Sequence, residues 1–109
     1  MTSARITPDY SVAAQIGAGD VAAIKAQGFR SIMCNRPDGE SFDQTDVAQI
    51  RAEAERQGLA FAFVPVISGA ITLDDVEDFR AALAELPAPV LAYCRSGARC
   101  RNLWMLAQG

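Results

Sequence analysis

The sequence contains no histidine, and this absence narrows the chemistry that the chain can perform. Histidine is the most frequent general base and a common metal ligand, so its absence excludes nucleophiles activated by histidine and most zinc or iron sites. Only thiolates and carboxylates are left as ligands. We therefore expect a protein that works without a metal ion or another cofactor.

Cysteine is scarce as well, with three residues at positions 34, 94 and 100. An odd number of cysteines does not fit a disulfide scaffold and agrees with a reducing compartment. Residues 1–8 have no apolar core of the kind found in signal peptides, and no apolar run approaches the roughly 18 residues that a membrane-spanning helix needs. These features predict a cytoplasmic protein that does not bind a membrane.

The chain also has little net charge, −3 in 109 residues. A nucleic-acid-binding protein needs a dominant basic face, so we expect no nucleic acid as partner. Three of the ten basic residues nevertheless lie within seven positions, Arg95, Arg99 and Arg101. This cluster predicts a local anion site. Half of the residues are apolar, and the length fits a single domain over residues 1–109.

Helical and strand-like segments alternate along the sequence. Expected helices cover residues 20–27, 46–57, 73–86 and 102–106, and expected strands cover residues 29–34, 61–66 and 89–93, with a short edge strand at 11–14 after an irregular lead-in over residues 1–10. Gly28 and Gly58 are placed to end helices, and Thr45 and Thr72 to begin them. The alternation predicts an α/β fold in which a small, mostly parallel central sheet is flanked by helices.

Ligands of parallel sheets bind beyond the carboxyl ends of the strands. The strands that end near Cys34, Val66 and Tyr93 would bring their following loops to one edge. Asn35 and Arg36 are therefore candidates for lining a pocket there, together with the loop over residues 67–72. Asp38 is expected to fix the turn around it.

Cys94 is the candidate nucleophile, because it sits where an apolar strand turns into a helix. The backbone N–H groups of such a turn converge and favour an anion. That field and the nearby arginines should lower the thiol pKa from about 8.5 into the range of activated thiols. Arg99 is assigned to catalysis as the anion-binding arginine, and the rest of the substrate-binding loop comprises Arg95, Ser96, Gly97 and Ala98. Arg95 and Arg101 are equally well explained as solvated charges.

Three further candidates have two explanations each. Cys100 is either a thiol that resolves an oxidised or persulfidated Cys94, or a residue packed at a helix start. Asp74 and Asp75 are the acids near the expected pocket, and each is either a general acid or a residue that stabilises a helix start. Cys34 is expected to be inert core.

Three segments, Cys94 to Arg99, Asn35 to Glu40 and Pro65 to Thr72, together resemble the small bacterial domain called beta-lactamase-hydrolase-like or DUF442, which is described as phosphatase-like or as a sulfurtransferase. The resemblance covers nearly the whole chain. It implies a cysteine-phosphatase-like α/β fold. It also implies a link, by fusion or gene neighbourhood, to a metallo-beta-lactamase-fold persulfide dioxygenase as partner.

The loop separates the chemistries of this family only in part. Tyrosine phosphatases carry His-Cys-x5-Arg, which would place His at position 93 and Arg at position 100, where this chain has Tyr93 and Cys100. The spacing from Cys94 to Arg99 is Cys-x4-Arg, similar to the loop of rhodaneses, and the family usually has a hydroxyl residue at position 100.

We first expect a sulfurtransferase that takes sulfur from a small anionic donor and carries it as a persulfide on Cys94. The alternative is a phosphatase that acts on a phosphate ester through a phosphocysteine. A non-catalytic redox or anion-binding module that uses Cys94 and Cys100 is the third hypothesis.

Overall fold

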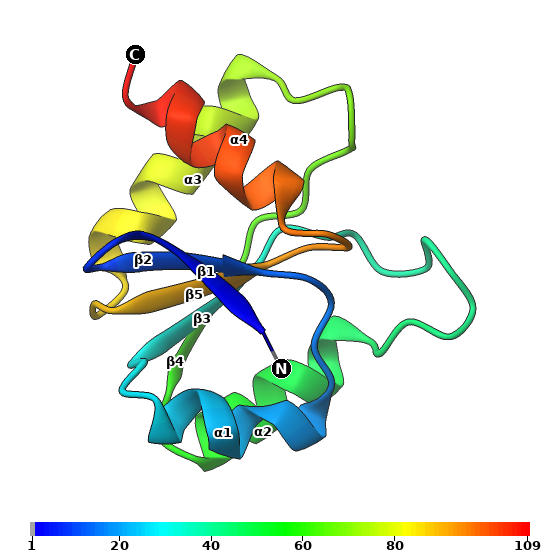
Figure 1. Cartoon of the computed structure of the whole chain (residues 1–109). Helices are drawn as coiled ribbons and strands as arrows, with labels where there is room; N and C mark the ends of the chain where they lie inside the picture. The colour runs from blue at the N-terminus through cyan, green and yellow to red at the C-terminus, as the bar shows by residue number, and fades with distance from the viewer. Residues whose placement is uncertain (1) are drawn as a thin grey trace.

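A five-stranded sheet separates two pairs of helices in the computed structural model, which describes residues 2–109 (Figure 1). The strands are β1 (Ser3–Thr7), β2 (Tyr10–Ala13), β3 (Ser31–Cys34), β4 (Ala60–Phe63) and β5 (Val90–Tyr93). The helices are α1 (Val21–Ala26), which follows the 3-10 turn η1 (Ala18–Asp20), α2 (Val47–Arg56), α3 (Leu73–Glu85) and α4 (Ala98–Ala107). None of the helices in residues 2–109 is both long and apolar enough to cross a membrane.

The strand order is β1-β2-β5-β3-β4, and only the β1–β2 pair is antiparallel. The expected fold class, a mostly parallel sheet flanked by helices, is confirmed. Strand β5 lies in the centre, where Val90 pairs with Tyr10 of β2 on one side and with Ser31 of β3 on the other. The strand that leads to Cys94 is therefore held by parallel neighbours along both edges.

Each face of the sheet has its own hydrophobic core. Helices α3 and α4 cover one face and α1 and α2 the other (Figure 1). Successive residues of β5 alternate between them, with Val90 and Ala92 in the first core and Leu91 and Tyr93 in the second. Because both faces are buried, the strand has an uninterrupted apolar sequence.

The N-terminal hairpin was not expected. Residues 3–7 form an antiparallel edge strand rather than an irregular lead-in, and β2 lies inside the sheet between β1 and β5. The sequence of β1 lacks a clear apolar alternation because an edge strand with a largely solvated surface does not need one. The turn between the strands is short, and the N–H of Asp9 donates to Oγ1 of Thr7 at 3.1 Å.

The helix starts agree with the sequence in one case and differ in two. Thr72 caps α3 as expected, in a reciprocal pair of hydrogen bonds with Asp75. Thr45 does not cap α2, because Asp46 is the N-cap residue and the first helical N–H, that of Val47, donates to Oδ1 of Asp38 at 2.8 Å. Helix α4 begins at residue 98 instead of 102, directly after a glycine with positive φ.

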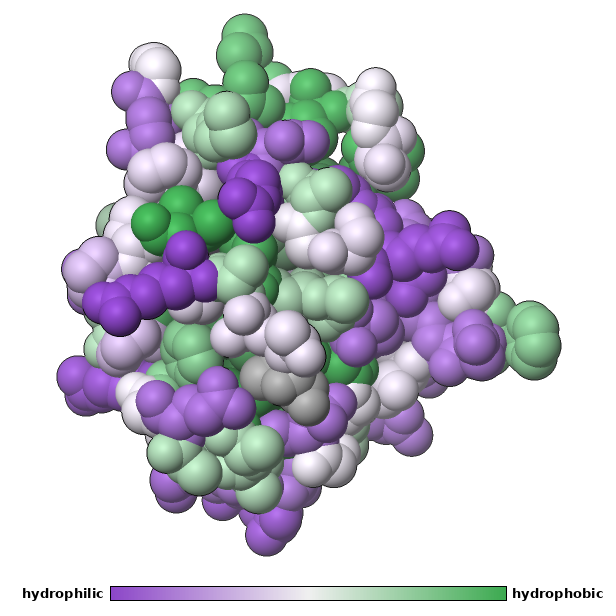
Figure 2. Space-filling view, in the orientation of Figure 1, coloured by the Kyte–Doolittle hydropathy of each residue, from purple (hydrophilic) through white to green (hydrophobic). Residues whose placement is uncertain are grey.

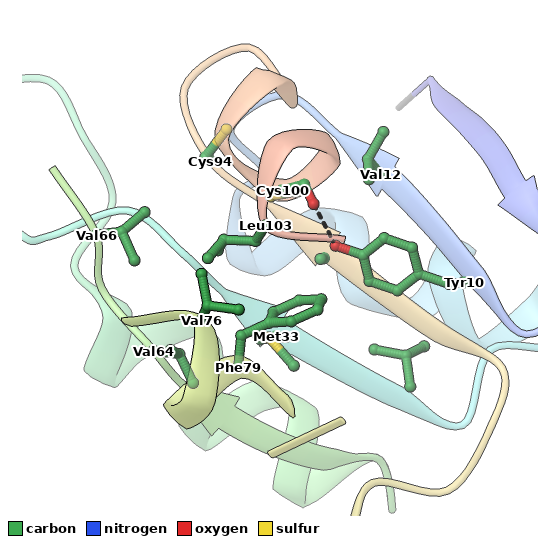
Figure 3. Packing of buried hydrophobic residues seen from close by; sticks show 12 residues of the cluster. Tyr10, Val12, Met33, Val64, Val66, Val76, Phe79, Cys94, Cys100 and Leu103 are labelled. Carbon is green, nitrogen blue, oxygen red and sulfur yellow. Dashed lines mark hydrogen bonds between the residues drawn. The ribbon is translucent and has the colours of Figure 1, made fainter. Parts of the chain in front are cut away.

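Tyr10 connects the sheet to the start of α4. Its ring meets Phe79 edge-to-face, and its hydroxyl donates a buried hydrogen bond of 2.8 Å to the carbonyl oxygen of Cys100 (Figure 3). The sheet therefore positions the helix turn that follows Cys94.

We predict that Tyr10→Phe lowers the free energy of unfolding by about 1 kcal/mol, because it removes a buried hydrogen bond and keeps the ring. Urea denaturation measures the change. Tyr93→Phe is the matched control, since the Tyr93 hydroxyl is buried without a hydrogen-bond partner among residues 2–109, and its removal should cost clearly less. Equal losses in the two variants would contradict the role of the Tyr10 bond.

Candidate active site

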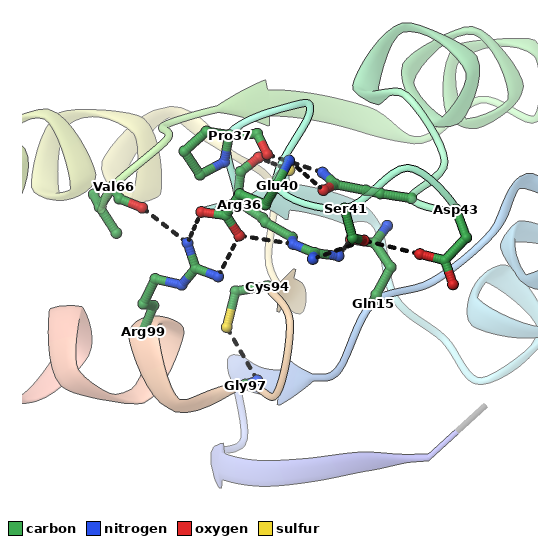
Figure 4. Close-up of polar contacts among 12 residues, drawn as sticks. Gln15, Arg36, Pro37, Glu40, Ser41, Asp43, Val66, Cys94, Gly97 and Arg99 are labelled. Carbon is green, nitrogen blue, oxygen red and sulfur yellow. Dashed lines mark hydrogen bonds and ion pairs between the residues drawn. The ribbon is translucent and has the colours of Figure 1, made fainter. Parts of the chain in front are cut away.

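Loops from the carboxyl ends of all four parallel strands meet at one edge of the sheet (Figure 4). Gln15 follows β2, the segment 35–40 follows β3, Val66 follows β4, and Cys94 follows β5. The expected convergence of the loops after β3, β4 and β5 is confirmed. The contribution of β2 was not anticipated from the sequence.

The sulfur of Cys94 lies inside a ring of backbone N–H groups. The N–H of Gly97 donates to Sγ at 3.0 Å, and the backbone N–H groups of Ser96, Arg99 and Cys100, in the same loop, favour the thiolate as well. Gly97 makes this ring possible, because its φ of 92° lies in the left-handed region that residues with a Cβ rarely adopt. The loop is therefore already shaped around a negative charge.

The same surroundings lower the pKa of the Cys94 thiol to about 5. The largest cause is a hydrogen bond from the Cys100 side chain; the backbone N–H groups act in the same direction and burial opposes them. Burial raises the pKa of Cys100 itself, so that residue stays a protonated donor. At neutral pH the site holds a thiolate next to a thiol.

Arg99 is almost completely buried and is held by a carboxylate. Its two terminal nitrogens donate to the two oxygens of Glu40 at 2.8 Å each, and Nη1 also donates to the carbonyl oxygen of Val66 at 3.1 Å. Arg36 donates to the same carboxylate from Nε at 2.9 Å. Hydrogen bonds from Arg99 first, and from Arg36 second, lower the pKa of Glu40 to about 2.

One edge of the Arg99 guanidinium remains free. A guanidinium has five N–H groups, of which three are used by Glu40 and Val66. The other two, on Nε and Nη2, donate to no oxygen among residues 2–109, and they lie on the side of the guanidinium that faces Cys94 (Figure 4). Glu40 therefore fixes the plane of the guanidinium and leaves a two-donor edge for an anion at Cys94.

Asn35 and Arg36 do not line the pocket, so this expectation is wrong. Asn35 is fully buried, and its Nδ2 donates to the carbonyl oxygen of Val64 at 2.9 Å. Arg36 is 4% exposed and binds Gln15, Glu40 and Ser41. Both polar side chains are used to tie loops together, and sequence alone does not distinguish that use from contact with a ligand.

The pocket beside Cys94 has a volume of about 370 Å³ and is lined by Glu40, Ser68, Arg95, Ser96, Ala98 and Arg99. Arg95 is exposed on its wall. Arg101 is not brought to it and lies in a different hollow, between the loop and the N-terminal hairpin. Figure 2 shows hydrophilic side chains gathered over the loop between β3 and α2, the loop that contributes Glu40.

Asp74 and Asp75 do not lie at this pocket either. Asp75 accepts the N–H of Thr72 at 2.9 Å as part of the helix cap, and Asp74 is exposed in the first turn of α3. The carboxyl group that lines the pocket is that of Glu40. The sequence contains one signal for it, since Glu40 ends the segment Asn35 to Glu40, but nothing local to that segment distinguishes its carboxyl group as part of the site.

A thiolate in a ring of N–H groups, followed by an arginine on the first turn of a helix, fits a cysteine-dependent phosphatase-like domain. Comparison with known proteins identifies the family of this domain. The sequence profile of the family described as "Beta-lactamase hydrolase-like protein, phosphatase-like domain" matches residues 3–109, and the chain belongs to this family.

Three relatives illustrate the similarity. The Beta-lactamase hydrolase-like protein of Agrobacterium fabrum is 35% identical over 99% of this chain, which spans 25% of that protein's length. A crystal structure from Neisseria meningitidis, of a protein provisionally called a phosphatase, is 37% identical with a TM-score of 0.89 and covers 96% of this chain and 75% of its own. Tk-PTP, at 14% identity and a TM-score of 0.65 over 88% of this chain and 62% of its own, shares the fold.

We predict that alkylation of Cys94 by iodoacetamide rises with pH around a midpoint near 5, because only the thiolate reacts. Cys100→Ala removes the largest stabilising hydrogen bond and should move the midpoint upward, whereas Cys100→Ser keeps a donor and should not. Mass spectrometry of the Cys94 peptide measures the rate. An unchanged midpoint in Cys100→Ala would contradict the role of the Cys100 thiol.

Proposed function

We propose that this domain is a cysteine-dependent phosphatase that forms a phosphocysteine at Cys94. The observation that carries the proposal is the free edge of Arg99 beside the N–H ring around Cys94. Two phosphoryl oxygens fit a guanidinium edge, and backbone N–H groups fit the others. The short Cys-x4-Arg spacing is compatible with this clamp, because Glu40 and Val66 orient the guanidinium.

The reaction has two steps. The Cys94 thiolate attacks phosphorus, the bond to the ester oxygen breaks, and its electron pair leaves with that oxygen. Water then attacks the phosphocysteine, phosphate is released, and sulfur leaves with the bonding electrons as the thiolate. A thiol whose pKa is about 5 is both deprotonated at neutral pH and a good leaving group.

The relatives support a phosphatase to different extents. The Neisseria protein, provisionally called a phosphatase, is 37% identical over most of both chains. The curated relative, in contrast, is about four times as long as the segment that this chain matches. The activity of such a whole protein, and the metallo-beta-lactamase-fold dioxygenase as a partner, remain proposals for this chain.

We predict that the protein hydrolyses p-nitrophenyl phosphate, that Cys94→Ser abolishes hydrolysis, and that Arg99→Lys reduces it by at least about 100-fold, because lysine lacks the planar two-donor edge. Steady-state release of nitrophenol measures the activity. Rapid quenching of the wild type should trap phosphate on Cys94. Hydrolysis that persists in Cys94→Ser would contradict the proposal.

A sulfurtransferase is the second candidate, and the Cys-x4-Arg spacing favours it. Here Cys94 would attack the outer sulfur of thiosulfate, sulfite would leave with the electron pair, and the persulfide would lie in the same ring of N–H groups.

We predict for this candidate that reduced protein gains one sulfur atom on exposure to thiosulfate, that cyanide removes it, and that Cys94→Ser gains none. Intact mass spectrometry measures the added sulfur, and the absence of any gain in mass would eliminate the sulfurtransferase.

The same measurement after treatment with hydrogen peroxide tests the third hypothesis, the non-catalytic redox module. A disulfide between Cys94 and Cys100 removes two hydrogens in the wild type and not in Cys100→Ser.

A further inference from the structure

The active-site pocket adjoins the buried nucleophile Cys94 and is lined by the anion clamp, but among residues 2–109 its wall has no group suited to protonate a leaving oxygen. The inference drawn from this absence concerns the choice of substrate, and it rests on the proposed phosphatase function. The carboxyl group that lines the pocket, Glu40, accepts hydrogen bonds from Arg99 and Arg36, and these hold its pKa near 2. It is ionised at neutral pH and has no proton to give.

The loop that overhangs the pocket offers no replacement. Residues 67–71, which contribute Ser68 to the wall, contain no acidic residue. The next two acids along the chain, Asp74 and Asp75, belong to the first turn of α3, and one of them is fixed in the helix cap. The remaining polar groups of the wall are hydroxyls and guanidiniums, which release protons too reluctantly to act as general acids near neutral pH.

Cys100 is also unsuited to this task. It is fully buried, it belongs to the core on the α3–α4 side of the sheet, and its thiol is the largest cause of the lowered pKa of Cys94. Its proton is used to stabilise the nucleophile.

We propose that the substrates of this domain are phosphate compounds whose leaving group departs as a stable anion, that is, aryl, enol or acyl phosphates, and that alkyl phosphates such as phosphoserine are excluded. In the first step the sulfur–phosphorus bond forms and the phosphorus–oxygen bond breaks. The electron pair stays on the departing oxygen, and no proton is transferred in that step. The leaving group must therefore be an acid comparable to a phenol or a carboxylic acid.

The test is the dependence of kcat/KM on the leaving group. A series of aryl phosphates whose phenols have pKa values from about 5 to about 10 is hydrolysed by the wild type, and kcat/KM is used because it is independent of phosphocysteine hydrolysis. Without protonation, charge develops fully on the leaving oxygen, so kcat/KM should fall by about tenfold for each unit of phenol pKa. A series that changes by less than about threefold over the whole range would overturn the inference.

Two variants test whether Glu40 or Asp74 acts as a general acid. Glu40→Gln should lower kcat/KM by the same factor for every ester, because the loss comes from misplacing Arg99. A loss that grows with the pKa of the phenol would identify Glu40 as a general acid and contradict the inference. Asp74→Asn should leave both the rate and the slope unchanged, and a steeper slope in that variant would contradict it as well.

The most activated ester, 2,4-dinitrophenyl phosphate, separates the two proposals. Its leaving group departs as a stable anion without a general acid, so Cys94-dependent hydrolysis of this ester is expected both from the phosphatase proposal and from the leaving-group inference. Hydrolysis of this ester together with a flat series would overturn the leaving-group inference and leave the phosphatase intact. Failure to hydrolyse even this ester would overturn both.

Discussion

The ion pair between Glu40 and Arg99 is the interaction on which the site depends. It joins the loop after β3 to the first turn of α4, and both ends are held again, Arg99 by the Val66 carbonyl and Glu40 by Arg36. Two parallel hydrogen bonds fix the plane of the guanidinium, and burial of Arg99 limits competition from water. The same pair that orients the anion clamp also keeps Glu40 ionised, so under the proposed function one contact would determine both how the substrate anion is bound and which leaving groups can depart.

The features that the sequence predicted are those encoded locally. Cys94 follows an apolar strand and precedes a helix within a few residues, and Thr72 and Asp75 form a cap within four. The role of Glu40 could not be predicted in this way, because its partner Arg99 lies 59 positions along the chain and no periodicity connects the two. Asn35 and Arg36 were misassigned for a related reason. A polar residue after a strand can face a ligand or a neighbouring loop, and only the tertiary structure distinguishes the two.

The chain activates a thiol without histidine by using the backbone and a second thiol. N–H groups of the loop are directed at the Cys94 sulfur, and Cys100 donates from the position where the family usually has a hydroxyl. Such an environment stabilises a thiolate, a phosphocysteine or a persulfide alike. Phosphoryl transfer and sulfur transfer differ in the atom that the thiolate attacks, but in both an anionic leaving group departs from that atom while the Cys94 sulfur stays in the ring of donors. This explains why one loop supports two candidate chemistries.

The hydrogen bond between Asp38 and the N–H of Val47 has a consequence for heat sensitivity. It anchors the segment that carries Glu40 to the N-terminus of α2, a helix on the face of the sheet opposite to α4. The segment between β3 and α2 contains no helix or strand and is held by side-chain hydrogen bonds instead, such as those from Gln44 to the Pro37 carbonyl and from Arg36 to Glu40, and a segment of this kind opens at lower free-energy cost than a paired strand. On warming, Arg99 would lose its orientation while β5 and its neighbours are still intact. Under the proposed function, activity would therefore be lost at a lower temperature than the fold.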